Sequence, residues 1–253
     1  MSGRLRIALT KGRLQDKSVE LFERMGLDCT PVRDPGRRLV HAIPNYPLDA
    51  VLAKAPDVIT YVEHGVCDLG VVGKDTILEK GGAFYEVLDL GFGRCRFALA
   101  VKEGTDFYGT YKTRRVASKY PAVTRAFFAE KGMDVDIIKI EGSVELAPIL
   151  SLTDAIVDIV ETGATLKANG LVPIETVAPV SARLIVNTAS MKLHKSQIND
   201  FIDRCEGELD RDIGFTSSKR MALPRCGSWR PCSPAPHRKT QISSWLSQQS
   251  CRM

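Results

Sequence analysis

Residues 154–165 combine two carboxylates with a turn of small hydroxyl residues, a set that can bind a phosphorylated sugar. The run 155–160 is apolar except for Asp158 and has the length and β-branched content of a strand buried on both faces. A short helix should follow and end before Gly170. Backbone N–H groups at this turn would bind phosphate, while Asp154 and Asp158 would hold ribose hydroxyls or a metal ion on pyrophosphate. The expected phosphate-binding residues are Glu161, Thr162, Gly163, Ala164 and Thr165.

Charged residues also follow other expected strands, where open α/β sheets bind their ligands. Two groups are expected to bind ATP or pyrophosphate, namely Lys11, Gly12 and Arg13 after the strand 6–10, and Gly73, Lys74 and Asp75 after the strand 68–72. A third loop-to-helix segment could orient the ribose or support the phosphate turn through Glu141, Ser143 and Glu145.

Each of these groups has a plain structural alternative. The threonine residues of the turn could only cap a helix, Lys11 and Arg13 could belong to a solvated basic turn, and Asp75 could be a helix cap. Acidic residues such as Glu141 and Glu145 are common at helix starts. The neighbouring Glu63 and His64 suggest acid–base chemistry, but a capping or satisfied core histidine is the simpler interpretation.

Seven blocks of the chain resemble the ATP phosphoribosyltransferases, the enzymes that open histidine biosynthesis. They stand in the order of that family and cover roughly residues 4–205; the blocks are 6–14, 60–65, 68–75, 88–93, 117–121, 142–165 and 181–187. The chain departs from the usual family residues, which are proline at position 10, glycine at 151, a smaller residue at 153 and often a basic residue at 164. Here these positions hold Thr10, Ser151, Thr153 and Ala164.

The resemblance implies transfer of the 5-phosphoribosyl group from phosphoribosyl pyrophosphate to N1 of ATP, with release of pyrophosphate. The adenine nitrogen attacks, so no protein nucleophile is expected, and Mg²⁺ and nearby cations would stabilise the departing pyrophosphate. The length of the matching region corresponds to the short form of the family. That form implies a homodimer of catalytic subunits and a hetero-oligomer with a histidyl-tRNA-synthetase-like regulatory subunit.

Strand and helix patterns alternate along residues 6–160, which predicts an α/β architecture with mainly parallel sheets. The resemblance further implies the two-lobed, type II periplasmic-binding-protein-like fold, with a mainly parallel sheet in each lobe and the active site in the cleft. Lobe I is expected to comprise 1–100 with 180–211, and lobe II, carrying the phosphoribosyl pyrophosphate site, 101–179. The remainder, 212–253, is expected to be a disordered or aberrant extension, with a basic recruitment tail as the alternative.

Composition is typical of a globular enzyme of the cytoplasm. The 253 residues carry a net charge of +5, of which residues 206–253 account for +4, so the rest of the chain is nearly neutral. This charge argues against a nucleic-acid partner, and the lack of a long apolar run argues against secretion or a membrane location. Seven cysteines without a CxxC spacing predict free thiols rather than zinc ligands or a disulfide framework.

Two other functions remain open at this point. One is a two-lobed module that binds a small anion without chemistry, which would show saturable phosphate binding and no release of pyrophosphate. The other is a conventional phosphoribosyltransferase for a purine or orotate, which usually shows a longer run of paired acids before its turn, whereas Asp154 and Asp158 stand four residues apart.

Overall fold

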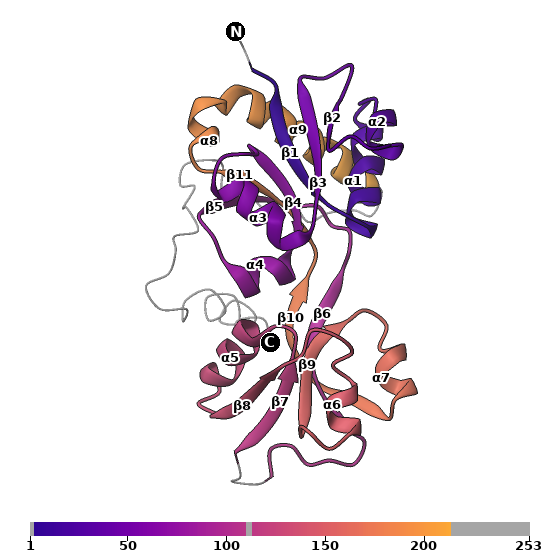
Figure 1. Cartoon of the computed structure of the whole chain (residues 1–253), viewed down its shortest axis with the longest axis vertical. Coiled ribbons are helices and arrows are strands. Elements are labelled where there is room, and N and C mark those ends of the chain that lie inside the picture. Colours follow the sequence, from indigo (N-terminus) through magenta and orange to yellow (C-terminus); the bar gives the residue numbers. More distant parts are fainter. Residues whose placement is uncertain (1–2, 110–112, 214–253) are drawn as a thin grey trace. The chain divides into compact units, whose positions relative to one another are not determined.

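The chain folds into two compact units in the computed structural model, which describes residues 3–109 and 113–213 (Figure 1). Among the described residues, unit 1 comprises 3–93 and 181–213, and unit 2 comprises 94–180. The chain therefore leaves unit 1 once and returns to it once. The expected tail, 212–253, lies outside the described residues except for the last two residues of the final helix.

Unit 1 is built around a six-stranded mixed sheet with the order β2-β3-β1-β4-β11-β5. Strands β3, β1 and β4 are parallel neighbours, and β2, β11 and β5 run antiparallel to the strands beside them. The strands are β1 (Leu5–Thr10), β2 (Val40–Ala42), β3 (Leu48–Ala53), β4 (Leu69–Gly73), β5 (Phe84–Asp89) and β11 (Ala182–Asn187). The helices are α1 (Arg13–Arg24), α2 (Thr30–Arg33), α3 (Ala55–Glu63), α4 (Lys74–Lys80), α8 (Ser190–Leu193) and α9 (Lys195–Ile213).

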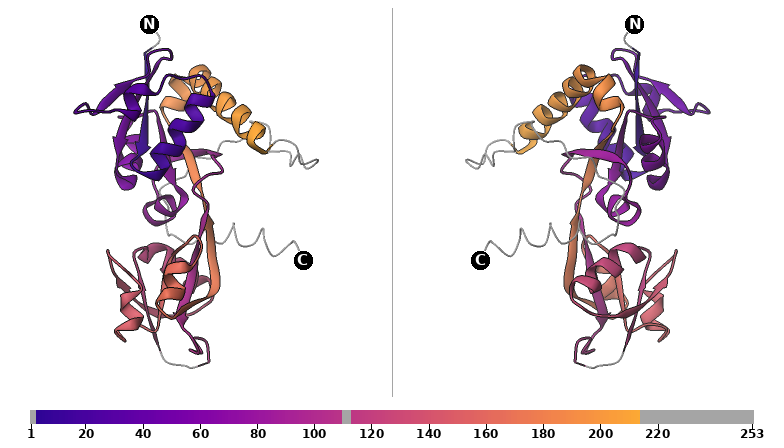
Figure 2. Two further views of the ribbon diagram at one scale, coloured as in Figure 1. Left: turned by 90° about the vertical axis from the view of Figure 1, so that its right-hand side faces the viewer. Right: turned by 90° about the vertical axis from the view of Figure 1, so that its left-hand side faces the viewer.

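Helices cover both faces of this sheet because successive side chains of a strand point to opposite faces. Ile7 of β1 packs in one core with residues of α1 and α9, and Ala8 packs in the other core with residues of α3 and α4. The rings of Phe22 in α1 and Phe201 in α9 meet edge to face with centroids 5.5 Å apart. Figure 2 shows α1 and α9 on the same side of the sheet, with their axes diverging.

Unit 2 has a five-stranded mixed sheet with the order β10-β6-β9-β7-β8. Strands β9, β7 and β8 are parallel, and β6 is antiparallel to both of its neighbours. Its elements are β6 (Cys95–Lys102), β7 (Arg114–Ser118), α5 (Pro121–Glu130), β8 (Val135–Lys139), α6 (Leu146–Ile149), β9 (Ala155–Val160), α7 (Ala164–Ala168) and β10 (Leu171–Val180). One face packs against α6 and α7 through a cluster that includes Ala117, Ile156 and Val160.

The two-lobed α/β fold is confirmed, but the sheets are mixed where mainly parallel sheets were expected. The cause is the path of the chain, because β6 and β10 carry it into and out of unit 2 and pair antiparallel with each other. In unit 1, β11 is the returning segment and runs antiparallel to β4 and β5. Within the described ranges, no helix is long and apolar enough to cross a bilayer.

Candidate functional site

Three loops of unit 2 leave the same edge of its sheet, because β8, β7 and β9 are parallel neighbours. Lys119 follows β7, the segment 140–145 follows β8, and the segment 161–163 follows β9. The structure therefore brings together the expected phosphate turn with Asp158, Glu141, Ser143 and Glu145. This grouping is the arrangement in which an α/β sheet binds a ligand beyond the carboxyl ends of its strands.

The turn 161–165 is exposed and its backbone is available to a ligand. Gly163 adopts φ 79° and ψ 5°, a left-handed conformation that glycine takes without strain. Within the described part of the chain, no acceptor is bonded to the backbone N–H of Thr162, Gly163 or Thr165. The N–H of Ala164 approaches the Thr162 hydroxyl at 3.4 Å. Since α7 has only five residues, these amides, rather than the helix dipole, provide the attraction for an anion.

Asp158 lies two residues before the end of β9, and it is half-buried. Its Oδ1 accepts a hydrogen bond of 2.8 Å from the backbone N–H of Ile159. The pKa of Asp158 is raised above its ordinary value, and burial is the largest cause. The hydrogen bond from Ile159 opposes this rise, the Glu145 carboxylate adds to it, and the Lys119 ammonium opposes it. A carboxylate placed in this way is suited to accept hydrogen bonds from sugar hydroxyls.

Asp154 does not belong to this group, which corrects the expectation that it acts together with Asp158. It stands before the first residue of β9, so about 13 Å of strand separates it from Asp158 at roughly 3.3 Å per residue. Its Oδ2 accepts a 2.8 Å hydrogen bond from the Arg115 backbone, and its Oδ1 lies 4.0 Å from the Arg114 guanidinium. Asp154 therefore supports the start of β7 and β9, and the two aspartates cannot share one metal ion.

The polar residues of the loop before α6 occupy different surroundings. Glu141 is exposed, and its ion pair of 2.6 Å with Lys139 lowers its pKa. Ser143 is exposed, whereas Glu145 is half-buried and electrostatically coupled to Asp158. Glu145 is thus the residue of this loop whose charge acts on Asp158. Among the described residues, no group of three or more His, Cys, Asp or Glu residues could hold a metal ion.

Unit 1 also collects charged residues at the carboxyl ends of its parallel strands. The register of β1 with β4 pairs Leu9 with Val71, so Lys11 comes level with Gly73. The backbone N–H of Lys11 donates to Ala53 at 2.9 Å, which brings the neighbouring Lys54 to the same edge. The segments 11–13 and 73–75 therefore do lie side by side.

Lys74 and Asp75 are less open to a ligand than the sequence suggested. The Lys74 ammonium donates to Glu86 at 2.6 Å, and the Arg183 guanidinium lies 3.4 Å from the other oxygen of Glu86. The Asp75 carboxylate folds back so closely over Gly73 that a Cβ atom at position 73 would collide with it. A side chain at position 73 would therefore require the Asp75 carboxylate to move, whether or not a substrate binds.

The structure explains the Glu63–His64 pair without catalysis. His64 ends α3, and its Nδ1 lies 3.0 Å from the Thr60 carbonyl oxygen. A carboxylate oxygen of Glu63 accepts a 3.1 Å hydrogen bond from the backbone N–H of Ala83. Both side chains thus serve helix termination and loop attachment, as the simpler interpretation held.

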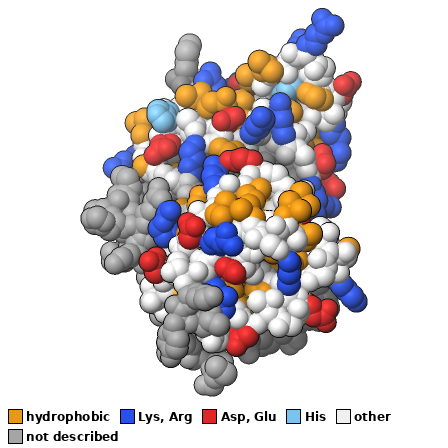
Figure 3. Space-filling view, turned by 60° about the horizontal axis from the view of Figure 1, so that its bottom comes forward, with side chains coloured by type: hydrophobic (Ala, Val, Ile, Leu, Met, Phe, Trp, Pro, Cys, Tyr) orange, Lys and Arg blue, Asp and Glu red, His pale blue; other side chains and the backbone are white. Residues whose placement is uncertain are grey.

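Sequence reasoning missed Lys119 and Lys54 as cations at the two strand edges. Both stand directly after a strand, and Lys119 lies inside the block 117–121, so position relative to a strand end was the available signal. Figure 3 shows Lys and Arg side chains interspersed with Asp and Glu on one face of the molecule.

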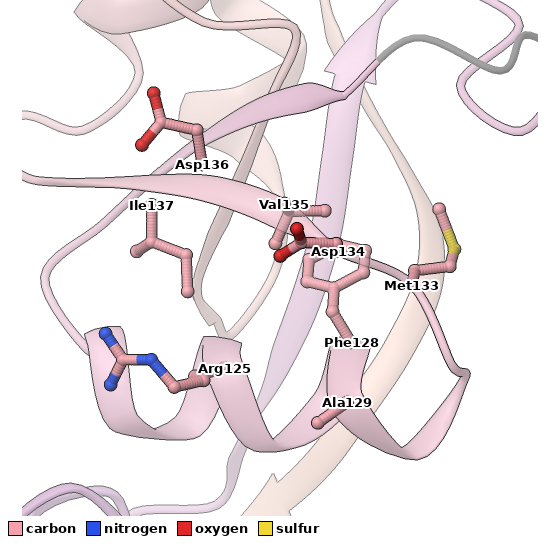
Figure 4. A pocket seen from close by; sticks show the side chains of 8 residues that line it. All are labelled: Arg125, Phe128, Ala129, Met133, Asp134, Val135, Asp136 and Ile137. Atoms are coloured by element: carbon pink, nitrogen blue, oxygen red, sulfur yellow. The ribbon is translucent and has the colours of Figure 1, made fainter.

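A hollow of about 360 Å³ lies elsewhere in unit 2, between α5 and the edge strand β8 (Figure 4). Its lining contains no expected site residue; it consists of Arg125, Phe128, Ala129, Met133, Asp134, Val135, Asp136 and Ile137. The figure shows Arg125 and Ile137 facing each other between helix and strand, with Asp136 directed away from the helix. It is therefore a surface feature apart from the phosphate turn.

Comparisons with known proteins identify the family and the fold of the chain. The family model described as ATP phosphoribosyltransferase matches residues 54–207. An ATP phosphoribosyltransferase of Clostridium kluyveri is 55% identical over 207 residues, covering 82% of this chain and 94% of the relative. The structure of the ATP phosphoribosyl transferase (HisG:HisZ) complex from Thermotoga maritima superposes with a TM-score of 0.71 at 30% identity, covering 82% of this chain and 98% of that one. The periplasmic aliphatic sulphonate binding protein SsuA of Escherichia coli, at 12% identity and a TM-score of 0.56, shares the fold over 83% of this chain and 74% of its own.

Proposed function

The chain belongs to the ATP phosphoribosyltransferase family, and on that premise we propose that the turn 161–165 of unit 2 binds the 5-phosphate of phosphoribosyl pyrophosphate while Asp158 holds the ribose. The reaction is the first step of L-histidine biosynthesis, in which the 5-phosphoribosyl group passes to N1 of ATP and pyrophosphate leaves. The observation that carries the assignment is the set of amides of Thr162, Gly163 and Thr165, which have no hydrogen-bond partner among the described residues, near the half-buried carboxylate of Asp158.

In this reaction the protein residues align the substrates, and none of them acts as a nucleophile. The bond between the anomeric carbon and the pyrophosphate oxygen breaks, the adenine N1 takes the carbon, and the pyrophosphate keeps the electron pair. Amides fixed by the Gly163 turn hold one end of the sugar, and Asp158 holds its hydroxyls, so the anomeric carbon is presented in one orientation. The cations at the edge of unit 1, Lys11 and Arg13, are proposed to bind the phosphates of ATP or the pyrophosphate.

Mg²⁺ is the metal that the family implies, and the side chains of this protein do not form a separate site for it among the described residues. Asp154 is bonded to the backbone of β7, and Asp158 to its own neighbour in the chain. We therefore expect any Mg²⁺ to be held by phosphate oxygens of the substrates, which are ligands that this ion prefers.

The matched pair Asp158→Asn and Asp154→Asn tests the site. Both variants make the same chemical change on the same strand, but only Asp158 lies at the phosphate turn. Pyrophosphate release from phosphoribosyl pyrophosphate with ATP should show a KM for the sugar substrate raised about tenfold or more for Asp158→Asn and unchanged for Asp154→Asn, because a hydrogen bond to a charged group is worth about 1.5–3 kcal/mol. Equal effects of the two changes would refute the assignment, and release with another base but not with ATP would refute the choice of acceptor.

The phosphate turn has its own test in Gly163→Ala. The added Cβ meets only Val160 at 3.7 Å, so it causes no collision, but it disfavours the left-handed backbone that presents the amides. We expect a higher KM for phosphoribosyl pyrophosphate and an unchanged KM for ATP. Gly170→Ala, at the other end of α7 with φ 65° and open space around it, is the matched control for backbone strain and should leave both constants unchanged.

A regulatory partner is also proposed, because the similar Thermotoga maritima structure is a HisG:HisZ complex. We expect this chain to form a homodimer and to join a histidyl-tRNA-synthetase-like subunit. The purified chain alone should be weakly active and insensitive to histidine, and addition of the partner should raise its rate and confer inhibition. Full activity and full histidine inhibition of the single chain would exclude this proposal.

The cytoplasm is the compartment that we propose for this protein. Among the described residues, Cys29, Cys67 and Cys205 are buried free thiols, which is the usual state in a reducing compartment.

A further inference from the structure

Lys119 lies level with Asp158 on the neighbouring strand of unit 2. The parallel register of β7 and β9 pairs Ala117 with Ile156; two residues further along the chain from each stand Lys119, directly after the end of β7, and Asp158, within β9. Side chains two residues apart in a strand point to the same face. Asp158 therefore lies on the face of Ile156, which packs in one cluster with Ala117 and with Val144 of the segment that leads into α6, and Lys119 leaves the end of β7 level with Asp158.

The register is fixed up to the last residue before Lys119. The Ser118 hydroxyl donates to the Val157 carbonyl oxygen at 2.6 Å, and the Tyr120 backbone N–H donates to the same hydroxyl at 2.9 Å. Ser118 is fully buried, so this pair of hydrogen bonds holds the end of β7 firmly against β9. The backbone of Lys119 is thus held on both sides while its side chain is exposed.

Asp158 has one like charge and one opposite charge near it. Glu145 approaches from the loop before α6, and Lys119 from the loop after β7, whereas the residue paired with Asp158 on β6 is the uncharged Ala98. Among the described residues Lys119 forms no closer ion pair, and its charge also acts on Glu141. One cation therefore balances a carboxylate pair at the centre of the proposed sugar site.

We propose that Lys119 is a positioning residue, whose ammonium group keeps Asp158 ionised and directed toward the ribose hydroxyls of phosphoribosyl pyrophosphate against the repulsion of Glu145. The proposal rests on the sugar site assigned above. Removing the cation leaves Asp158 beside the Glu145 charge with no opposite charge near it among the described residues, which favours protonation of Asp158, and the protonated form loses acceptor capacity for the sugar. Removing the Glu145 charge should have the opposite effect.

The pH profile of kcat/KM for phosphoribosyl pyrophosphate tests this inference in the full chain. Lys119→Met raises the pKa of Asp158, so the acid limb should move to higher pH by about 0.5–1 unit, which is below most of the range of about 1–3 units for a close opposite charge because the Lys119 side chain is exposed. Its loss relative to wild type should be absent well above the acid limb and should grow toward acid pH, to about three- to tenfold below both limbs, which is the shift of 0.5–1 unit expressed as a ratio. Glu145→Gln should move the limb to lower pH, the double variant should return it near the wild-type position, and Lys119→Arg should keep it there.

Lys139→Met is the matched control, since it removes a cation from the same sheet edge one strand further from Asp158. A shift as large as that of Lys119→Met would mean a general charge effect and would overturn the inference. A uniform loss at all pH values with no shift of the limb would also overturn it, because Lys119 would then act on substrate directly. If Asp158→Asn leaves the KM for the sugar unchanged, the proposed site itself fails, and that result is separate from the behaviour of Lys119.

Discussion

Ser151 is the one described residue other than glycine with a positive φ, 61°. A side chain in this left-handed region costs about 1 kcal/mol or more, because its Cβ crowds the following carbonyl. The side chain is exposed, so little contact would be lost on its removal. The resemblance to the family had already marked this position as one where glycine is usual, and the backbone conformation gives the physical reason.

Ser151→Gly is therefore expected to raise the free energy of unfolding by about 0.5–1 kcal/mol, the strain relieved less the entropy of glycine in the unfolded chain. Urea unfolding followed by circular dichroism measures the change. Ser151→Ala keeps the Cβ and should not stabilise the protein. A gain from alanine as large as that from glycine would show that backbone strain is not the cause.

Thr153, just before β9, lowers the stability of the fold through a buried hydroxyl group. Its side chain is 5% exposed, and its hydroxyl has no hydrogen-bond partner among the described residues. Thr153→Val keeps the shape and removes the unsatisfied hydroxyl, so we expect stabilisation by about 1 kcal/mol in the same unfolding experiment. Thr153→Ser, which keeps the hydroxyl and loses a buried methyl group, should destabilise the protein by about 1 kcal/mol. Destabilisation by valine would mean that the hydroxyl does find a partner in solution.

At the scale of elements, Gly70 sets how closely α3 approaches the sheet of unit 1. A Cβ at this position would come within 2.8 Å of Val62 and 2.9 Å of Val58, both on α3, and 3.2 Å of Ile185 on β11. Glycine in the middle of β4 therefore reflects close packing of a helix on a strand, not a turn. The helix and the strand 69–73 it covers support the loop with Gly73, Lys74 and Asp75.

The same substitution at two glycines should have opposite effects. Gly70→Ala should lower the free energy of unfolding by about 2 kcal/mol through overpacking. The double variant Gly70→Ala/Val62→Ala should recover part of that loss. Gly207→Ala, on the exposed side of α9 with no atom near the added Cβ, should raise stability by about 1 kcal/mol through helix propensity. Thermal unfolding of the three variants measures these changes in stability. If Gly70→Ala left the stability unchanged, that result would contradict the close approach of α3 to β4.

Sequence patterns identified some elements well because their signals are local. The strand 155–160 is present with the expected bounds, and the helix after it ends before Gly170 as expected. Two acids four residues apart on a strand were nevertheless treated as one site, although strand geometry separates Asp154 and Asp158 by about 13 Å. The pairing of Lys119 with Asp158 depends on the register between strands 39 residues apart, which periodicity does not reveal. The Lys74–Glu86 pair is likewise a contact between separate elements.

At the scale of the whole molecule, unit 2 is one continuous segment inserted into unit 1. The two ends of the segment are paired, since Cys95 at the start of β6 lies opposite Val180 at the end of β10. The ends of unit 1 are also joined, because the backbone N–H of Ala182 donates to the Phe92 carbonyl oxygen at 2.9 Å. Each unit has its own sheet and its own buried core, so each meets the structural requirement for folding alone.

We therefore expect the segment 94–180 to fold when produced by itself, and unit 1 to fold when a turn of about four glycines joins Gly93 to Ser181, a length typical of loops between adjacent strands. Each fragment should show cooperative urea unfolding, because each keeps a complete sheet and a buried core of its own. The isolated segment carries the turn 161–165, Asp158 and Lys119, so it should bind phosphoribosyl pyrophosphate in calorimetry but release no pyrophosphate with ATP. The Asp158→Asn segment is the control and should lose that binding. A segment that folds cooperatively yet binds no sugar phosphate would mean that residues of unit 1 are required for the site, and a segment that does not fold would mean that unit 1 stabilises unit 2.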